Sequence, residues 1–201
     1  MLYLFTGVSQ LPDDFIDTCK WFLPKWRLDR MMSYRYSSDR KLSASAYLIL
    51  VYALKNEGLF HALPEFGYGP NGKPFLINNP GLHFNFSHCS NAVVCFLSDT
   101  EVGVDVERVC EYDDELAQAI CNDDEYRMIV STSGLEERAL RFTELWTRKE
   151  SVVKWRGTGI DRDPKEILMG HSAENQKEGH QIFSVYYPAE NIYISVCNKN
   201  V

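Results

Sequence analysis

Two short motifs carry acidic side chains at spacings that suit metal binding. In the first, Asp105 and Glu107 alternate with valines, and residues two apart in an extended strand lie on the same face. In the second, Glu150 stands four residues before Lys154, so a helix would place both side chains on one face. Three carboxylates beside a lysine suit Mg²⁺, which leaves octahedral positions for water and substrate phosphate. Together the motifs predict a site for magnesium and a diphosphate.

Each motif alone has a simpler interpretation. An Asp-x-Glu pair is common on the solvated face of a half-buried strand. Glu150 and Lys154 could equally form an exposed ion pair, which contributes about 0.3 to 0.5 kcal/mol. The functional interpretation therefore depends on the motifs that accompany them.

Two further motifs precede the acidic ones, Gly72-Lys73-Pro74 and Asn85-Phe86-Ser87-His88. In this order, the set of motifs closely resembles the 4′-phosphopantetheinyl transferase superfamily, in particular its Sfp-type members. The resemblance extends from about the first basic segment to Gly159. It implies a Mg²⁺-dependent enzyme that transfers 4′-phosphopantetheine from coenzyme A to a serine of an acyl or peptidyl carrier protein. The other product would be adenosine 3′,5′-bisphosphate.

The resemblance also implies roles for the acidic and basic residues. Asp105, Glu107 and Glu150 would ligate Mg²⁺, and Lys154 would contact the same phosphates. Glu150 and Lys154 are therefore the expected catalytic residues. Either Glu150 or a metal-bound water would remove the proton from the attacking serine hydroxyl.

Coenzyme A also presents an adenine and a separate 3′-phosphate. By resemblance, Ser87 and His88 would contact phosphate, the loop around Lys73 would reach the adenine and ribose, and Arg40 would bind the 3′-phosphate. The expected coenzyme A contacts are Lys25, Arg35, Arg40, Lys73, Pro74, Ser87, His88 and Lys154.

The chain departs from the family pattern in two places. Cys89 follows His88 where Ser or Asp is usual, which bears on the phosphate contacts. The segment 119–121 is Ala-Ile-Cys where the family tends to have Arg, an aromatic residue and Phe, which bears on carrier docking. Trp146 is predicted to be a core residue that anchors the helix under Glu150.

The charge of the chain limits its partners. A net charge of −7 argues against a generic nucleic-acid binder, which needs a concentrated basic surface. Seven of the 21 Lys and Arg lie between positions 20 and 41, which predicts a local anion site. Between positions 99 and 125 there are eleven acidic residues and one basic residue, and part of this acidity could hold a cation. The rest is predicted to be a solvated surface.

The composition indicates a cytoplasmic protein. Six cysteines show no zinc-binding spacing, which fits a reducing compartment. No apolar run reaches membrane-spanning length, and the short apolar start predicts a strand and not a signal peptide. We therefore expect no membrane partner, and the chain length suggests a monomer of the Sfp type.

Two long helices are predicted from apolar periodicity. The first begins near Ser38 or Asp39 and ends at Gly58. The second is expected to open with a capping box from Ser133 to Glu136, to end at Gly157, and to carry Lys149 and Glu150 on one face.

The strand predictions complete the fold. A turn-rich region at 67–81 precedes three strands at about 82–86, 92–97 and 102–106, which are expected to form an antiparallel meander. Two more strands, at about 182–186 and 192–196, are expected to pair. This order suggests an α+β fold of two halves, without a literal sequence repeat.

The resemblance adds the arrangement of those halves. They would be two pseudo-symmetric α+β units, each a long helix packed on a small, mainly antiparallel sheet, with the ligand cleft between them. Residues 1–100 would form the N-terminal half, which holds the adenine and 3′-phosphate end of coenzyme A. Residues 101–201 would form the C-terminal half, with the Mg²⁺-binding carboxylates and the second long helix.

Two other functions remain open at this level. Carboxylates on a strand near Glu and Lys also build Mg²⁺-dependent nucleases and phosphodiesterases, although the acidic net charge counts against them. A non-catalytic module that binds coenzyme A or a carrier protein would leave the carboxylates without a role.

Overall fold

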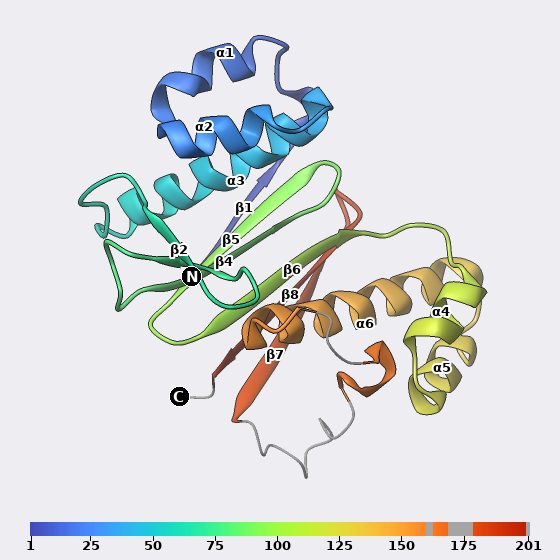
Figure 1. Ribbon diagram of the computed structural model, residues 1–201. Helices are drawn as coiled ribbons and strands as arrows, with labels where there is room; N and C mark the ends of the chain where they lie inside the picture. Colours follow the sequence, from blue (N-terminus) through green and yellow to red (C-terminus); the bar gives the residue numbers. More distant parts are fainter. Residues whose placement is uncertain (160–162, 169–178, 200–201) are drawn as a thin grey trace.

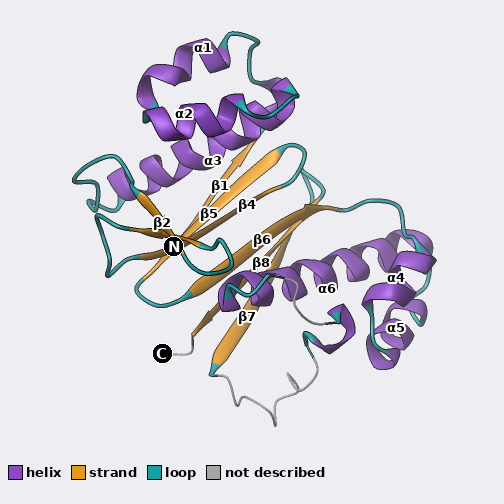
Figure 2. Ribbon diagram, in the orientation of Figure 1, coloured by secondary structure: helices purple, strands orange, loops and turns teal. Residues whose placement is uncertain are grey.

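The computed structural model describes residues 1–159, 163–168 and 179–199. The described residues form an α+β fold with two three-stranded antiparallel sheets, and a long helix packs against each sheet (Figure 1). Short helices lie outside both long helices, as the colouring by secondary structure shows (Figure 2). The predicted fold class is therefore confirmed.

The first sheet has the strand order β1-β5-β4. Its strands are β1 (Leu2–Thr6), β4 (His83–His88) and β5 (Ala92–Ser98). The long helix α3 (Ser37–Asn56) packs on it, close to the predicted bounds. The chain before α3 forms η1 (Val8–Gln10), α1 (Phe15–Cys19), η2 (Lys20–Phe22) and α2 (Lys25–Met32).

The second sheet has the order β6-β8-β7. Its strands are β6 (Val102–Arg108), β7 (His180–Tyr187) and β8 (Ile192–Lys199). The long helix α6 (Leu135–Arg156) packs on this sheet. Between β6 and α6 the chain forms α4 (Asp114–Ile120) and α5 (Asp123–Val130), and η3 (Pro164–Glu166) follows α6.

Alternation along β5 gives each sheet its own core. Val93, Cys95 and Leu97 face α3 and are fully buried against its apolar stripe. Ala92 and Val94 lie on the other face of β5 and pack with valines and isoleucines of β6 and β8. Because successive side chains of a strand point to opposite faces, one strand can join both cores. The two sheets are therefore held together by apolar packing.

Three local predictions differ from the structure. The third strand does not continue the meander, because β6 pairs with β8 and not with β5. The turn-rich region contains a short hairpin of β2 (Phe66–Tyr68) and β3 (Pro74–Leu76). The helix α6 has Gly134 at its N-cap, with φ 88° and no side-chain cap bond, so the expected capping box is absent. Glycine adopts this positive φ at no steric cost and turns the chain directly into the helix.

Gly103 lets α6 lie directly on β6. A Cβ at this position would lie 2.1 Å from the Ser151 carbonyl oxygen and 2.3 Å from the Trp155 backbone nitrogen. Only glycine permits this approach of helix backbone to strand backbone. The residues that follow on the same face of β6, Asp105 and Glu107, are thereby brought next to α6.

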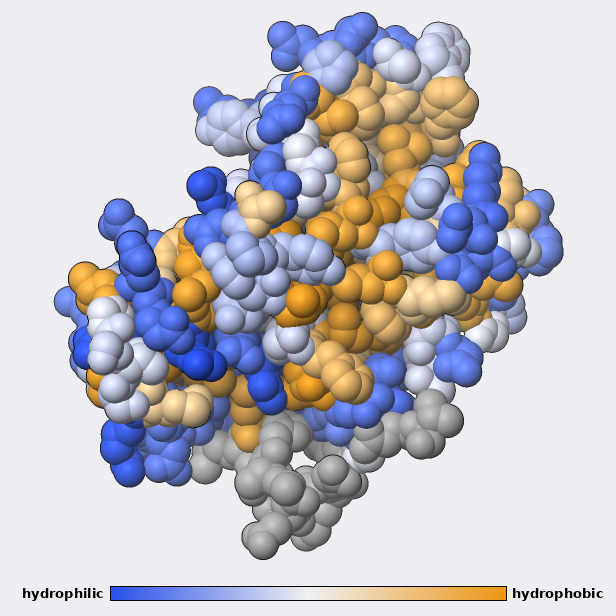
Figure 3. All heavy atoms as spheres, turned by 180° about the vertical axis from the view of Figure 1, so that it is seen from behind, coloured by the Kyte–Doolittle hydropathy of each residue, from blue (hydrophilic) through white to orange (hydrophobic). Residues whose placement is uncertain are grey.

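The face opposite the view of Figure 1 has both hydrophobic and hydrophilic regions. Seen from behind, hydrophobic residues gather across the middle of the molecule, with hydrophilic residues around them (Figure 3). Within the described ranges, none of the helices combines the length and the apolarity needed to cross a membrane.

Candidate active site

The centre of the site is a hydrogen-bonded group of three side chains from three elements. Lys154, on α6, places its Nζ 2.5 Å from Asp105 Oδ1 on β6 and 2.7 Å from Ser87 Oγ on β4. Ser87 Oγ also donates to Asp105 Oδ1, at 2.9 Å. Beside this group, Asn85 Oδ1 accepts from the Val104 backbone N–H at 2.9 Å, so β4 and β6 are fixed side by side. The structure thus brings together residues that lie far apart in the sequence.

The acidic side chains around Lys154 have more negative charge than the protein neutralises. Asp105 is 2 % exposed, and its Oδ2 is buried without a hydrogen-bond partner among the described residues. Burial, followed by repulsion from Asp105, raises the pKa of Glu107 to about 7, although Lys154 opposes the rise. Burial and the charge of Asp105 also raise the pKa of Glu150. A divalent cation would satisfy the orphaned oxygen and relieve this repulsion, so the residues fit Mg²⁺.

The carboxylates of Asp105, Glu107 and Glu150 interact electrostatically, but their oxygens are not arranged as a metal coordination shell in the described residues. Among the described residues, no group of three or more His, Cys, Asp and Glu side chains is arranged to hold a metal ion. One Asp105 oxygen is already bonded to Lys154.

Trp146 differs from its predicted role as a core anchor. It is half-buried. A hydrogen bond from its side chain to Glu107 partly opposes the rise in the pKa of that carboxyl group. Trp146 lies one helical turn before Glu150 on α6, so the face that carries Glu150 also holds a donor for the strand carboxylate. Trp146 therefore contributes to the site through its contact with Glu107.

Two adjoining cavities form a cleft that leads away from this cluster. The cavity at the cluster has a volume of about 330 Å³ and is lined by Glu150 and Lys154. The other, of about 240 Å³, lies among α2, α3, β4 and the β2–β3 hairpin. Gly72, Pro74 and Phe86 line both cavities, which makes them continuous.

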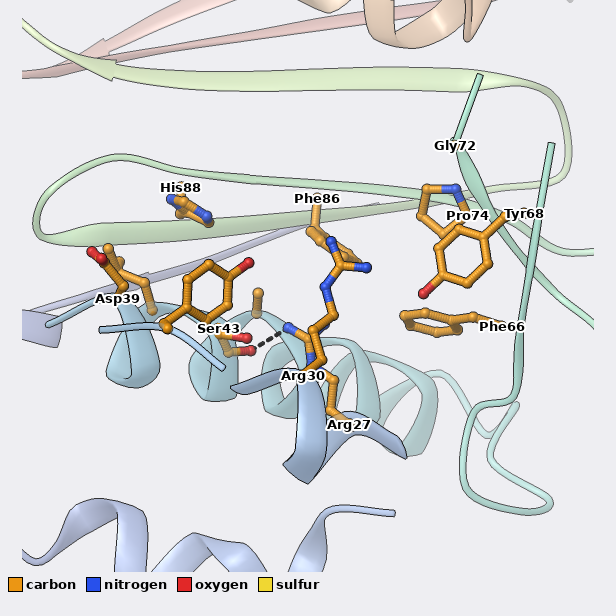
Figure 4. A pocket seen from close by; sticks show the side chains of 13 residues that line it. Arg27, Arg30, Asp39, Ser43, Phe66, Tyr68, Gly72, Pro74, Phe86 and His88 are labelled. Atoms are coloured by element: carbon orange, nitrogen blue, oxygen red, sulfur yellow. Dashed lines mark hydrogen bonds between the residues drawn. The ribbon is translucent and has the colours of Figure 1, made fainter. Parts of the chain in front are cut away.

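Two arginines that the sequence prediction did not select line the far cavity. Arg30 extends from α2 towards Phe86 on β4, whereas the Arg27 guanidinium points to Ser43 on α3 (Figure 4). Arg27 is 5 % exposed and donates from Nη2 to the Ser43 carbonyl oxygen, while its Nε has no partner among the described residues. Burial, followed by repulsion from Arg30, lowers the pKa of Arg27. With Arg27 and Arg30 against the single carboxylate of Asp39, the lining of this cavity has a net positive charge that suits an anion.

The basic residues that were predicted for the 3′-phosphate do not line this cavity. Lys25 is exposed and paired with Asp29, with 3.0 Å between Nζ and Oδ2. Arg35 is exposed and lies over the Tyr36 ring. Arg40 donates from Nε to the Tyr34 carbonyl oxygen at 2.9 Å. The three-residue spacing of Arg27 and Arg30 puts them on one face of α2, but it does not show which face of α2 meets the cleft.

His88 and the loop residues occupy different positions along the cleft. His88 lies at the rim of the far cavity, where partial desolvation and then the charge of Lys154 lower its pKa. Pro74 lines both cavities, and Lys73 lines the cavity at the cluster. The Lys73 ammonium bonds to Glu101 Oε2, Val102 O and Trp155 O, at 2.6, 3.1 and 3.0 Å.

Lys149 lies on a different side of α6 from Glu150. Its ammonium is fully buried and bonds to Glu125 Oε2 at 2.7 Å, to Ile120 O at 3.0 Å and to Pro164 O at 2.7 Å. The expectation that Lys149 and Glu150 share a face is therefore wrong, since adjacent helical residues point about 100° apart. Lys149 ties α6 to α4, α5 and η3.

The comparisons with known proteins agree with this geometry. The family model for the 4′-phosphopantetheinyl transferase superfamily matches residues 101–196, which include Asp105, Glu107, Glu150 and Lys154. A 4′-phosphopantetheinyl transferase of Bacillus subtilis is 29% identical over 75% of this chain and 70% of its own length.

Other relatives match over shorter stretches. The transferase gsp of Aneurinibacillus migulanus is 37% identical over 57% of this chain and 45% of its own length. The transferase Sfp of Bacillus subtilis strain 168 is 32% identical over 44% of this chain and 39% of its own length. The chain thus spans about half the length of several curated relatives that it matches. These matches, and the motifs they share, show that the chain is similar to the 4′-phosphopantetheinyl transferase superfamily, above all over residues 101–196.

Proposed function

We propose that this protein transfers 4′-phosphopantetheine from coenzyme A to a serine of an acyl or peptidyl carrier protein. The observation that carries the proposal is the continuous cleft between a basic pocket and a carboxylate–lysine cluster. Coenzyme A has phosphates at two separate places, a diphosphate and a 3′-phosphate, and the cleft offers complementary chemistry at both of its ends.

The end of the cleft at the carboxylate–lysine cluster would hold the diphosphate. Asp105, Glu107 and Glu150 would bind Mg²⁺, which would neutralise charge on the diphosphate oxygens. Lys154 would turn from Asp105 towards a phosphate oxygen, a short movement for a flexible side chain. Ser87, which is hydrogen-bonded to Asp105 and Lys154, would donate its hydroxyl hydrogen to a phosphate oxygen.

The far end of the cleft would hold the 3′-phosphate and the nucleoside. Arg30 would approach the phosphate from the open side, and the unsatisfied Nε of Arg27 would complete a charge-assisted contact. His88 at the rim would add a further contact. This assignment replaces Lys25, Arg35 and Arg40 as the phosphate ligands.

The reaction needs a proton acceptor near the carrier serine. Glu150 lines the cavity at the cluster, where its carboxylate would face the incoming serine and could accept the proton. The serine Oγ would attack the phosphorus next to pantetheine as Glu150 takes its proton. The bond from that phosphorus to the bridging oxygen would break, and adenosine 3′,5′-bisphosphate would leave with the electron pair.

The two halves of the chain would have separate roles in binding. Residues 1–100 would form the half that holds the nucleotide, and residues 101–201 the half that holds the metal. We further propose a cytoplasmic monomer. The cysteines of the described residues form no disulfide, which is typical of a reducing compartment.

The test is a transfer assay read by intact-protein mass. The protein is incubated with coenzyme A, Mg²⁺ and a panel of apo carrier proteins. A carrier should gain one phosphopantetheine at its acceptor serine, and its Ser→Ala variant should gain none. Measurable coenzyme A binding with no modification of any carrier would indicate a binding module instead.

A further inference from the structure

Lys73 connects the two halves of the molecule through all of its hydrogen-bonding capacity. It belongs to the turn between β2 and β3, and its three acceptors all lie in the C-terminal half. They are the Glu101 carboxylate before β6, the Val102 carbonyl at the start of β6 and the Trp155 carbonyl on α6. An ammonium group has three N–H donors, so three acceptors leave none for a substrate.

The contact is built into the end of α6. The last carbonyl groups of a helix have no partner within the helix, and a lysine there is favoured by the helix dipole. The helix stops at Gly157, which has φ 68°, and a Cβ there would lie 2.9 Å from Lys73 Cδ. The aliphatic part of Lys73 therefore packs against the residue that ends α6. With a side-chain exposure of 18%, this lysine is largely enclosed.

Both ends of this bridge belong to walls of the cleft. Lys73 and its neighbours Gly72 and Pro74 line the cavity at the cluster from the hairpin side. Glu150 and Lys154 line it from the α6 side, and Lys154 directly precedes Trp155. A bond between Lys73 and Trp155 O therefore limits how far the two walls can separate.

We propose that Lys73 is a positioning residue that bridges the β2–β3 hairpin and the last turn of α6, and thereby sets the width of the cleft. Its ammonium acts on the protein and not on coenzyme A. The consequence for catalysis rests on the proposed function, whereas the bridge itself exists in the free protein and can be tested without a carrier.

Hydrogen exchange of the free protein tests the bridge. Lys73→Met keeps the aliphatic length and removes the ammonium, so amides of segments 66–76 and 152–158 should exchange at least about tenfold faster, equivalent to about 1.4 kcal/mol. Amides of β5 and β8 should keep their wild-type rates. Lys55→Met is the matched control, because Lys55 is an exposed lysine in the last turn of α3 and lines neither cavity of the cleft. It should leave the exchange rates of both segments unchanged. Unchanged exchange at both segments in Lys73→Met would overturn the proposal.

A second variant separates the bridge from a direct contact with the ligand. Lys73→Arg keeps the positive charge but replaces a compact ammonium with a longer planar group, which does not fit the same three acceptors. We expect it to loosen the same segments and, like Lys73→Met, to raise KM for coenzyme A about tenfold with kcat within about twofold of wild type. Wild-type exchange and KM in Lys73→Arg, with a raised KM in Lys73→Met, would show a direct charge contact and refute the bridge. If no carrier is modified by the wild type, the proposed function fails, but the exchange experiment still decides the bridge.

Discussion

Replacing Arg30 by alanine should weaken the binding of coenzyme A much more than the binding of dephospho-coenzyme A. Arg30 extends into the basic cavity, which has a volume of about 240 Å³ (Figure 4). A charge-assisted hydrogen bond to a phosphate contributes about 1.5 to 3 kcal/mol. Because Arg30 is exposed to solvent, the lower value applies, and it corresponds to a loss of roughly tenfold in affinity. Dephospho-coenzyme A lacks the 3′-phosphate, so its Kd should change by less than about twofold.

Isothermal titration of both nucleotides into wild type and variant measures this difference directly. Arg35→Ala is the matched control, since Arg35 is also an exposed arginine of the basic segment but lies over Tyr36 and outside the cavity lining. It should leave both affinities unchanged. An equal loss of affinity for the two nucleotides in Arg30→Ala would refute the placement of the 3′-phosphate, as would a tenfold effect of Arg35→Ala on coenzyme A alone.

Three further predictions concern the metal cluster and its supports. Asp105→Asn should lower kcat by at least about a thousandfold and abolish the response of turnover to added Mg²⁺, with a thermal melt as the check on folding; a near wild-type kcat at saturating Mg²⁺ would reject the ligand assignment. Lys149→Met leaves the buried Glu125 carboxylate without its cation and should lower the free energy of unfolding in urea by about 3 to 5 kcal/mol, whereas a loss below about 1 kcal/mol would show that the pair is not buried in solution. Gly103→Ala should force α6 away from β6, because the new Cβ would overlap the Ser151 carbonyl, and should therefore reduce both thermal stability and transfer activity. Crystallographic or calorimetric evidence that this variant keeps the wild-type packing would contradict the close approach.

Much of the fold was accessible from local patterns. The apolar stripe of the first long helix predicted the residues that α3 buries, among them Leu42, Leu50 and Ala53. Alternation along β6 predicted that Val104 and Val106 enter the core while the acidic residues face the other way. These predictions succeeded because the backbone repeat of a helix or strand fixes which side chains share a face, whatever the rest of the chain does.

The pairing of strands was not accessible in the same way. A meander would have joined β6 to β5, but β6 pairs with β8, about ninety positions further on by register. Apolar strands of similar length are interchangeable as partners in a sequence pattern. Only the shared core, in which one face of β5 packs against β6 and β8, makes the separation into two sheets favourable.

The candidate site shows the same division. The sequence by itself determined the carboxylates of β6, the Glu150–Lys154 pair and the motif with Ser87, since each depends on spacing within one element or on a short motif. It could not determine which arginine of the basic segment reaches the cleft. That choice depends on the rotation of α2 about its axis, which is set by the burial of Met31 against Tyr47 on α3. Likewise, the hydrogen bond from the Lys73 ammonium to Trp155 O joins residues 82 positions apart, and only the packing of the β2–β3 hairpin beside α6 brings these atoms together.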